Sequence, residues 1–264
     1  MIIDEKSMIK ESFFMLLYKI KKACPNLKFC LLGDWGQLPP PCDRSLTFNY
    51  ADSFCVWELC DGNMVRLEKC RRSDKALFDL YANPASVQPS MFPNDVENLN
   101  ITYKNSTRKH INDHFMRKYA KKFGFTIELK ADPHVKQSQD VILFPGLKCI
   151  AATTRQSYGF ANCDEFVVYD FDHDEVQLCF SSEEDEDDID EQKLVIIPTS
   201  EFTKFMQPSY AITAHRMQGS SISRQFSIWD WEFMCNKLKY VALSRSRKLE
   251  YISICSQEQL ARLR

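Results

Sequence analysis

Glycine is scarce in this chain, with seven residues among 264, and none of the seven is followed by lysine. A phosphate-binding loop of the pattern G-x-x-x-x-G-K-[ST] needs its glycines so that backbone N–H groups can approach phosphate oxygens, and it needs its lysine to reach the same oxygens. The sequence therefore contains no such loop, and this excludes a self-contained nucleotide site of that type.

Cysteine is plentiful, but no two cysteines show the C-x-x-C spacing of common metal and redox sites. The total is 11, an odd number, and a conceivable zinc site from Cys55, Cys60 and Cys70 matches no standard ligand spacing. The sequence shows no signal-peptide pattern, and its longest apolar run is far shorter than the ~20 residues that span a membrane. We therefore expect reduced thiols in an intracellular compartment, the cytoplasm or the nucleus.

Negative charge gathers in one place. The chain has 34 basic and 36 acidic residues, a net charge of −2, but residues 183–191 (EEDEDDIDE) hold eight acids and no base. Setting these eight aside leaves 34 basic against 28 acidic residues, a net charge of +6. Such a remainder permits a surface that contacts nucleic-acid phosphates without requiring one. The acidic run itself is expected to be a solvated loop tip.

The first forty residues predict a strand–helix–strand unit. A short apolar strand at residues 2–3 leads into two acids, residues 8–23 carry an apolar helical face, and residues 27–32 (LKFCLL) form a second apolar strand. This order is typical of a parallel sheet, whose ligands lie beyond the carboxyl ends of its strands. The side chains expected to gather there are Asp4, Glu5, Asp34 and Gln37.

The middle of the chain predicts a connection and a second unit. Residues 45–74 indicate a short helix and then a strand at residues 64–68 (MVRLE), and residues 82–98 are rich in Pro, Asn and Ser and read as a linker. A strand at residues 100–105 and a helix at residues 106–123 open the second unit.

Residues 126–200 predict a small β-barrel or sheet inserted in the chain, because six short β-rich segments follow one another there at intervals of roughly 10–15 residues. After this insert, the pattern predicts a helix at residues 211–217 and strands at residues 239–243 and 251–254. The second unit is therefore expected to be α/β, interrupted by β structure.

Residues 33–41 (GDWGQLPPP) form a specific short motif. Gly33 allows the chain to turn after the strand, and the prolines stiffen the loop that carries Gln37. An amide held rigidly beside a metal-bound phosphate suits a sensor of the γ-phosphate. An ordinary proline-rich turn is the alternative.

Two further motifs lie near the C-terminus. Residues 210–223 (YAITAHRMQGSSIS) gather a histidine, an arginine, a glutamine and a glycine where a predicted helix breaks. Residues 239–248 (KYVALSRSRK) end an apolar strand in Arg245, whose guanidinium would project from a sheet edge. For Arg245 alone, a surface ion pair is the alternative interpretation.

Taken together and in this order, the segments resemble the C-terminal two-thirds of a superfamily 1B DNA helicase of the Pif/RecD group. The segments resemble, in chain order, motif II or Walker B (IIDEKSM), motif III (GDWGQLPPP), motif IV (LEKCRRSD), the start of the second RecA-like domain (ITYKNSTRKHIN), motif V (YAITAHRMQGSSIS) and motif VI (YVALSRSR). The style of the sequence is also similar to helicases of large DNA viruses, which would place the protein at a viral replication site.

The resemblance implies an α/β fold of the RecA-like P-loop NTPase type, with a partial first RecA-like domain and a second one that carries an inserted SH3-like β domain. The implied boundaries are residues 1–75 for the partial domain 1A with motifs II to IV, 76–98 for a linker, 99–128 and 198–264 for domain 2A with motifs V and VI, and 129–197 for the inserted 2B domain, which includes the acidic loop 183–191.

The sequence departs from the family pattern at three places besides the missing phosphate-binding loop. Motif IV has Cys70-Arg71-Arg72 where Phe-Arg-Gln is usual, and the β insert lacks the usual Asn-Gly turn. Motif V has Arg216 where lysine is usual, and since both are cations, contact with DNA phosphates is still expected.

The resemblance also assigns roles to nucleotide-site residues. Asp4 is expected to bind Mg²⁺, Glu5 to orient the attacking water and accept its proton, and Gln37 to sense the γ-phosphate of ATP. The expected arginine fingers are Arg71 and Arg245. Gln218 and Gly219 are expected to line the nucleotide cleft.

The candidate DNA-binding residues are Asn105, Arg108, Thr213, His215 and Arg216. For His215, a packing role is the alternative. The implied activity is ATP hydrolysis coupled to 5′–3′ movement on single-stranded DNA, with an N-terminal half supplying the missing loop if the chain is a fragment or a split subunit. The alternative is a non-catalytic remnant of a helicase that binds DNA or a protein partner.

Overall fold

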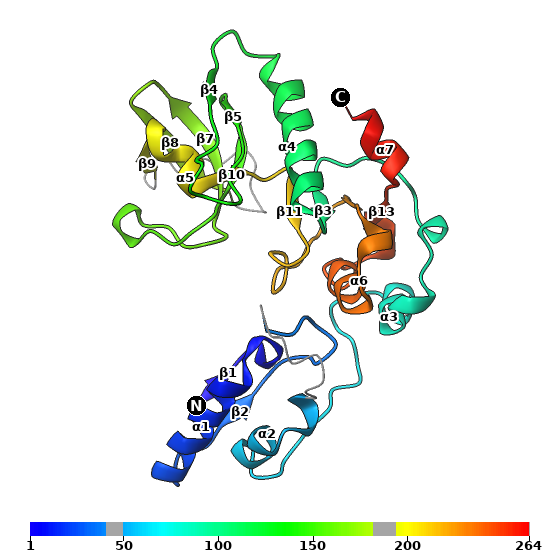
Figure 1. Cartoon of the computed structure of the whole chain (residues 1–264). Helices are drawn as coiled ribbons and strands as arrows, with labels where there is room; N and C mark the ends of the chain where they lie inside the picture. Colours follow the sequence, from blue (N-terminus) through cyan, green and yellow to red (C-terminus); the bar gives the residue numbers. More distant parts are fainter. Residues whose placement is uncertain (41–49, 182–193, 264) are drawn as a thin grey trace. The chain divides into compact units, whose positions relative to one another are not determined.

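The structure, a computed structural model, describes residues 1–40, 50–181 and 194–263 (Figure 1). These residues form two compact units, each assembled from separate stretches of the chain. Unit 1 comprises Met1–Gln88, Met217–Arg224 and Met234–Tyr251, and unit 2 comprises Pro89–Arg216, Gln225–Phe233 and Ile252–Arg264. The acidic run expected to be a loop tip, residues 183–191, lies outside the described residues.

Unit 1 begins with the predicted strand–helix–strand unit, which is confirmed. Strand β1 (Ile2–Ile3) pairs in parallel with β2 (Cys30–Leu31), and helix α1 (Glu11–Ala23) lies between them in the chain (Figure 1). Phe14 and Leu17 on the buried face of α1 pack in one apolar cluster with side chains of β2 and helix α2 (Phe54–Leu59). The apolar spacing that predicted the helix is therefore the spacing that holds it against the short sheet.

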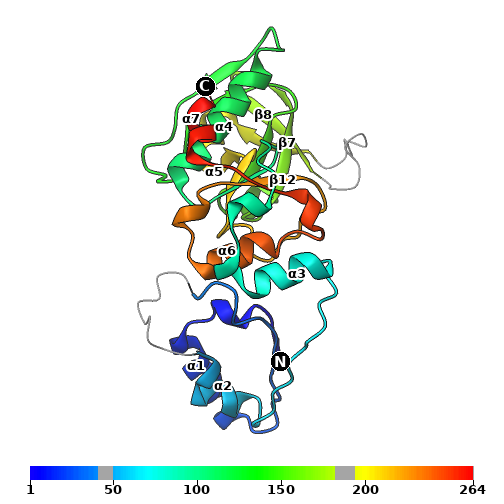
Figure 2. The same cartoon turned by 90° about the vertical axis from the view of Figure 1, so that its right-hand side faces the viewer.

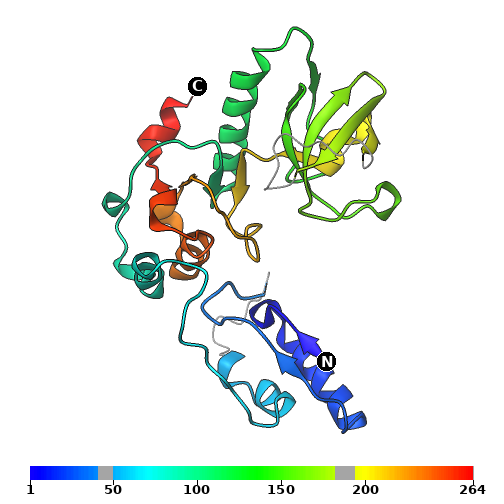
Figure 3. The ribbon, with the colours of Figure 1, turned by 180° about the vertical axis from the view of Figure 1, so that it is seen from behind.

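The rest of unit 1 consists of short helices. Helix α3 (Lys75–Ala82) packs beside α6 (Asn236–Leu243), as Figures 2 and 3 show. The side chain of Asp74 caps α3 by accepting from the backbone N–H of Leu77 at 2.8 Å, and its second oxygen accepts from Leu249 N at 2.9 Å. The 3₁₀ helices of this unit are η1 (Lys6–Met8), η2 (Tyr50–Asp52), η3 (Pro84–Ser86) and η9 (Leu249–Tyr251).

Unit 2 contains a four-stranded sheet in which every pair of neighbouring strands is parallel, in the order β11-β3-β12-β13. The strands are β3 (Asn100–Thr102), β11 (Ala211–Thr213), β12 (Phe226–Ile228) and β13 (Ile252–Ile254). Helix α4 (Asn105–Ala120) follows β3, and α7 (Gln257–Arg262) follows β13. The α/β character expected for the second unit is confirmed.

Between α4 and β11 the chain forms antiparallel β structure, and all six strands predicted in residues 126–200 are confirmed. One sheet has the order β10-β6-β7-β8-β9, and a separate pair is formed by β4 and β5. The bounds are β4 (Ile127–Leu129), β5 (Val141–Leu143), β6 (Lys148–Ala151), β7 (Glu165–Phe171), β8 (Glu175–Phe180), β9 (Val195–Pro198) and β10 (Met206–Pro208), with η5 (Gln156–Tyr158), η7 (Thr199–Glu201) and α5 (Phe202–Phe205) in the connections.

Two predicted elements form the other kind of regular structure, and a third does not form. Residues 211–217, expected to be helical, form strand β11 and then a turn, because Ala211 and Ile212 are buried beside β3. Residues 239–243, expected to be a strand, belong to helix α6, whose Leu238, Val241 and Ala242 are buried at helical spacing. A short apolar run fits either structure, so its pattern alone does not separate the two.

The strand expected at residues 64–68 does not form, and this stretch has no regular structure. Its apolar side chains Met64, Val65 and Leu67 are 66%, 85% and 89% exposed, so no neighbouring strand or helix of the described part covers them. Helices α3 and α7 and strand β12 were not indicated by the sequence patterns, and α3 extends into the range expected to be a linker. No helix of the described residues combines the length and the apolar character needed to cross a bilayer.

A buried polar network ties the parallel sheet of unit 2 to its surroundings. Asn100, the first residue of β3, is fully buried, and its amide nitrogen donates to the carbonyls of Glu97 and Tyr210 at 3.0 Å each. Its oxygen accepts from the indole N–H of Trp229 at 2.8 Å. Because the amide of Asn100 is satisfied on both sides, it specifies how β3 meets the segments before β11 and after β12.

Asn100→Ala is expected to lower the free energy of unfolding by about 1–3 kcal/mol, because it leaves the buried indole N–H of Trp229 without an acceptor. Urea denaturation followed by tryptophan fluorescence measures this loss. The matched control is Asn162→Ala at an exposed position, which should change stability by less than about 0.5 kcal/mol. Equal losses in the two variants would contradict the network.

Candidate functional site

Two acid-bearing segments leave the short sheet of unit 1 at the same edge. Because Ile3 pairs directly with Leu31 in a parallel register, the residues that follow β1 and β2 emerge side by side. The backbone continues this pairing beyond the strands, since Lys6 N donates to Leu32 O at 2.9 Å. Asp4 and Glu5 follow β1, and Asp34 and Gln37 follow β2.

Gly33 allows the two segments to approach each other. Its φ of +144° is one that other residues rarely adopt, and a Cβ built on it would lie 2.7 Å from the backbone nitrogen of Lys6. Any side chain at this position would therefore push the loop carrying Asp34 and Gln37 away from the end of β1.

Glu5 combines backbone strain with an unsatisfied carboxylate. Its φ and ψ are +50° and +45°, a left-handed conformation that costs a residue other than glycine on the order of 1 kcal/mol or more. Its Oε2 atom is buried and has no hydrogen-bond partner among the described residues. Its backbone N–H donates to Oδ1 of the neighbouring Asp4 at 2.8 Å, while the Asp4 side chain is exposed. A strained residue that presents an unpaired carboxylate oxygen is typical of a ligand-binding position.

Gln37 and Gln218, separated by 181 positions, meet in unit 1. The amide nitrogen of Gln218 donates to Oε1 of Gln37 at 3.1 Å, and Gln218 Oε1 is buried without a partner in the described part of the chain. Gly219 follows Gln218 with a φ of +89° and open space around its α-carbon. The structure thus brings together two of the expected nucleotide-site residues and leaves one amide oxygen of the pair available.

Asp34 is fixed by a contact that the sequence motifs did not indicate. The hydroxyl of Tyr240 in helix α6 donates to Oδ2 of Asp34, and Gly36 N donates to Oδ1 at 2.8 Å. Burial, and then the hydrogen bond to Asp34, raises the pKa of Tyr240, so its phenol stays protonated and donates. A strand was expected at residues 239–243. The helix that forms there instead is the element that brings Tyr240 to this loop.

Arg245 lies inside unit 1, so the expected projection from a sheet edge is wrong. It follows the C-terminal end of α6 and is 1% exposed, with Nε donating to Val241 O at 3.0 Å and Nη1 donating to Ser220 O at 2.9 Å. Burial, with the like charge of Arg72 as the second cause, lowers the pKa of Arg245 to about 10, and the charge of Glu5 acts in the opposite direction. At neutral pH the guanidinium of Arg245 is therefore a buried cation whose hydrogen bonds go to neutral groups of unit 1.

Arg71 and Arg72 are both exposed. Of these neighbours, Arg72 is the one whose charge acts on Arg245, although Arg71 was the expected arginine finger. No group of three or more metal-ligating side chains gathers anywhere in the described residues, including around Cys55, Cys60 and Cys70. The conceivable zinc site from these three cysteines therefore does not form.

A second candidate site is a hollow of about 530 Å³ in unit 2. It lies where β3 and β11, which are parallel neighbours, deliver the residues that follow them. Its lining residues are Tyr103, Lys104, Asn105, Gln137, Thr213, His215 and Arg216. The structure therefore brings together four of the five expected DNA-binding residues, and it adds Tyr103, Lys104 and Gln137, which sequence reasoning missed.

The fifth expected residue, Arg108, is 2% exposed and lies within helix α4. Its guanidinium donates to Gln139 Oε1 at 3.1 Å and to Gln137 O at 2.9 Å, so it holds the segment that forms one wall of the hollow. Burial lowers the pKa of Arg108 to about 10, with the like charge of Arg216 as the second cause. Burial also lowers the pKa of Arg216, which lines the hollow.

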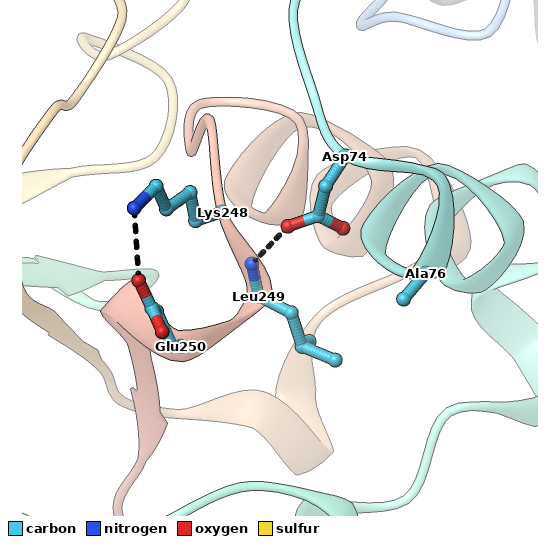
Figure 4. Close-up of a pocket in the computed structure, with 5 residues that line it drawn as sticks. All are labelled: Asp74, Ala76, Lys248, Leu249 and Glu250. Atoms are coloured by element: carbon cyan, nitrogen blue, oxygen red, sulfur yellow. Dashed lines mark hydrogen bonds and ion pairs between the residues drawn. The ribbon is translucent and has the colours of Figure 1, made fainter.

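Another hollow, of about 590 Å³, lies in unit 1 beside the start of α3 (Figure 4). Its polar groups are already paired with one another. Asp74 accepts from Leu249 N, and the ammonium of Lys248 lies 3.1 Å from a carboxylate oxygen of Glu250. None of the residues that line it was expected to carry function.

No protein-family model matches the chain, and no curated protein matches it. Solved structures do. The Pif1 helicase from Candida albicans superposes with a TM-score of 0.68 at 15% identity, over 99% of this chain and 74% of that one. Bacteroides Pif1 in complex with ADP-AlF3 and single-stranded DNA gives 0.61 at 16% identity, over 96% and 69% of the two chains.

A third solved structure comes from a study of two coordinating Pif1 helicases that unwind forked double-stranded DNA. It superposes with a TM-score of 0.64 at 17% identity, over 96% of this chain and 68% of that one. At such identities the likeness establishes the fold. The expected α/β class is confirmed, and the chain has the fold of Pif1 helicases over nearly its whole length.

Gly33→Ala is expected to destabilise the edge of the unit 1 sheet by about 1–3 kcal/mol, because the new methyl group would overlap the backbone of Lys6. Hydrogen exchange of residues 1–40 should accelerate accordingly. Gly124→Ala is the control, since a Cβ there meets nothing within 4 Å. Unchanged exchange in Gly33→Ala would show that the close approach is not required.

Proposed function

We propose that the chain is the motor portion of an ATP-dependent DNA helicase, which couples ATP hydrolysis to 5′–3′ movement on single-stranded DNA. One observation carries the proposal. Unit 1 gathers Glu5, Gln37, Gln218 and Arg245 from distant stretches of the chain, and the hydrogen bond from Gln218 to Gln37 joins two of them. Each of these residues stands in a different helicase-like motif.

The solved structures that share this fold support the proposal through their ligands. Bacteroides Pif1 was solved in complex with ADP-AlF3 and single-stranded DNA, and it was also solved bound to single-stranded DNA. A nucleotide and a DNA strand are the two ligands that the two candidate sites of this chain suit. We therefore assign the nucleotide to unit 1 and the strand to the hollow of unit 2.

We assign the domains along the lines of the same family. Residues 1–75 are the later part of a first RecA-like domain. Residues 99–128 and 198–264 form the second RecA-like domain, of which residues 217–224 and 234–251 pack within unit 1. Residues 129–197 form an SH3-like insertion. The parallel sheet of unit 2 with its helix α4 supports the second assignment, and the antiparallel sheet between α4 and β11 supports the third. Residues 76–98 connect the domains.

In this proposal the carboxylates at the end of β1 serve the nucleotide. An Mg²⁺ ion fits here because such ions are commonly held by one or two carboxylates together with substrate phosphates. The exposed carboxylate of Asp4 would hold the ion, which would neutralise phosphate charge. Glu5, with its buried and unpartnered Oε2 atom, orients the attacking water and accepts its proton.

The amides and arginines complete the proposed site. Gln37 senses the γ-phosphate, and loss of that phosphate changes its contact with Gln218, which lines the site together with Gly219. Arg245 is a cation whose hydrogen-bond partners in the described residues are all neutral, so its charge is available to stabilise a phosphate. Arg71 is proposed as the second arginine finger, because it is exposed and free to approach the nucleotide.

Because the phosphate-binding loop is missing, the proposed nucleotide site needs a further segment to hold the phosphates. None of the seven glycines precedes a lysine, so the loop that cradles the phosphates comes from another segment or another chain. The same observation favours a second candidate function, a non-catalytic remnant that binds DNA or a protein partner. A G-x-x-x-x-G-K-[ST] reading frame upstream of the codon for Met1 would favour the motor, and a promoter with no such frame nearby would favour the remnant.

The purified 264-residue chain alone is expected to hydrolyse ATP at a negligible rate, with or without single-stranded DNA, because no backbone loop holds the phosphates. A phosphate-release assay measures this. Glu5→Gln is the matched control for contaminating activity and should give the same background. Vigorous hydrolysis by the wild-type chain that Glu5→Gln abolishes would contradict the need for a supplied loop.

The same chain is expected to bind single-stranded DNA, and Arg216→Ala should weaken binding about equally for all sequences and lower the salt dependence of the affinity by about one charge. Fluorescence anisotropy at several salt concentrations measures both. Lys121→Ala, at the far end of helix α4 from the hollow, is the control and should bind as the wild type does. Absence of binding by the wild type at low salt would exclude the motor and a DNA-binding remnant, and it would leave only a remnant that binds a protein partner.

A further inference from the structure

We propose that the hollow of unit 2 holds one unpaired nucleotide of a single strand, with the base stacked on the rings of Tyr103 and His215 and the adjoining phosphate facing Arg216. The inference rests on the proposed function, which takes a nucleic-acid strand as the ligand of this hollow. Tyr103 is not among the residues that the sequence predicted to bind DNA. In this proposal its ring sets the affinity for each base.

The first argument is that two arginine side chains at the hollow have no carboxylate partner among the described residues. Arg216 donates to Gln207 Oε1 at 3.2 Å and to Ala152 O at 3.5 Å, and Arg108 behind it donates to Asn105, Gln137 and Gln139. All of these acceptors are neutral, and no carboxylate of the described residues pairs with either guanidinium. Two nearby cations with neutral partners are compensated best by an anion from outside, and a phosphate accepts from Arg216 in a fork geometry.

The second argument is the pair of rings at the same hollow. The rings of Tyr103 and His215 are stacked, with centroids 6.2 Å apart and planes inclined by 29°. Tyr103 is 37% exposed, which is high for an aromatic side chain in a lining position. Exposed aromatic rings beside unpaired cations match what a nucleotide in a single strand presents, a flat base next to a phosphate.

The platform is preorganised by a buried carboxylate. Asp230, which is 0% exposed, accepts from the backbone N–H groups of Tyr103 and Lys104 at 3.2 and 2.9 Å and from the hydroxyl of Thr107 at 2.8 Å. Lys104 is held in addition by the ring of Phe233, with its ammonium 3.0 Å from the ring centroid. The segment that carries Tyr103 therefore loses little freedom when a base stacks on it.

The contacts of Asp230 also narrow the class of ligand that the hollow suits. Backbone N–H groups at the start of a helix often bind phosphate, but at the start of α4 those of Tyr103 and Lys104 already donate to Asp230. A free phosphate or sulfate would gain no contact from these two N–H groups or from the rings, whereas a nucleotide gains the ring platform. A base in a duplex has both faces covered, so the platform suits an unpaired strand.

The test compares a labelled oligothymidine with an abasic strand of the same length, using the full chain and fluorescence anisotropy. Tyr103→Ala should weaken binding of oligothymidine by about tenfold or more, since a stacked base contributes on the order of 1–3 kcal/mol, and it should leave binding of the abasic strand unchanged. Tyr103→Phe keeps the ring and should bind both strands as the wild type does. Arg216→Ala should weaken both.

Equal effects of Tyr103→Ala on the two strands, or none on either, would overturn the stacking platform while leaving nucleic-acid binding intact. No binding of either strand by the wild type would instead overturn the proposed function. Near-ultraviolet circular dichroism establishes that the Tyr103→Ala chain is folded. An oligouridylate in parallel assigns the strand to DNA or RNA, and the loss in Tyr103→Ala is expected on whichever polymer binds more tightly.

Discussion

The parallel pairing of β1 with β2 is the contact on which the chemistry of unit 1 depends. Two residues from each strand are enough to fix the register, Ile2 with Cys30 and Ile3 with Leu31, and this register decides what leaves the sheet at its carboxyl edge. Beyond this edge, Glu5 adopts its left-handed conformation, and the loop that follows Gly33 carries Gln37 to its hydrogen bond with Gln218. Because of this pairing, unit 1 contains a carboxylate, a pair of amides and a buried arginine beyond the edge of a short apolar sheet.

In unit 2, polar residues also gather at the edge of a parallel sheet, but other contacts hold them there. Its parallel strands β3 and β11 also deliver polar residues to one edge, but there the buried carboxylate of Asp230 fixes the backbone of the first segment, and Arg108 fixes the segment opposite. In both units, buried polar groups hold the exposed ones in place. This division of labour explains why Arg108 and Asp230 matter for a site whose surface they do not form.

Much of the fold could be predicted from the sequence, because alternation along a strand and apolar spacing along a helix are local properties. Six strands of the antiparallel insert, β4 to β9, and helix α1 were predicted on that basis and are confirmed, whereas β10 was not predicted. Residues 239–243 were not, since a short apolar run suits a helix as well as a strand, and the error hid both the contact of Tyr240 with Asp34 and the burial of Arg245. Tyr103 and His215, whose rings are stacked, follow two strands that are far apart in the sequence and pair only in the folded chain, so no local sequence pattern indicates the contact.

The central claim is that the edge beyond β1 is half of a nucleotide-hydrolysing site, and Glu5 tests it most directly. The measurement is the rate of DNA-stimulated ATP hydrolysis after this chain is joined to a segment that supplies a G-x-x-x-x-G-K-[ST] loop, for the wild type and for Glu5→Gln. If Glu5 activates the water, the variant should lose a factor of about 10²–10⁴ in rate while still binding nucleotide. Equal rates for the two proteins would contradict the account.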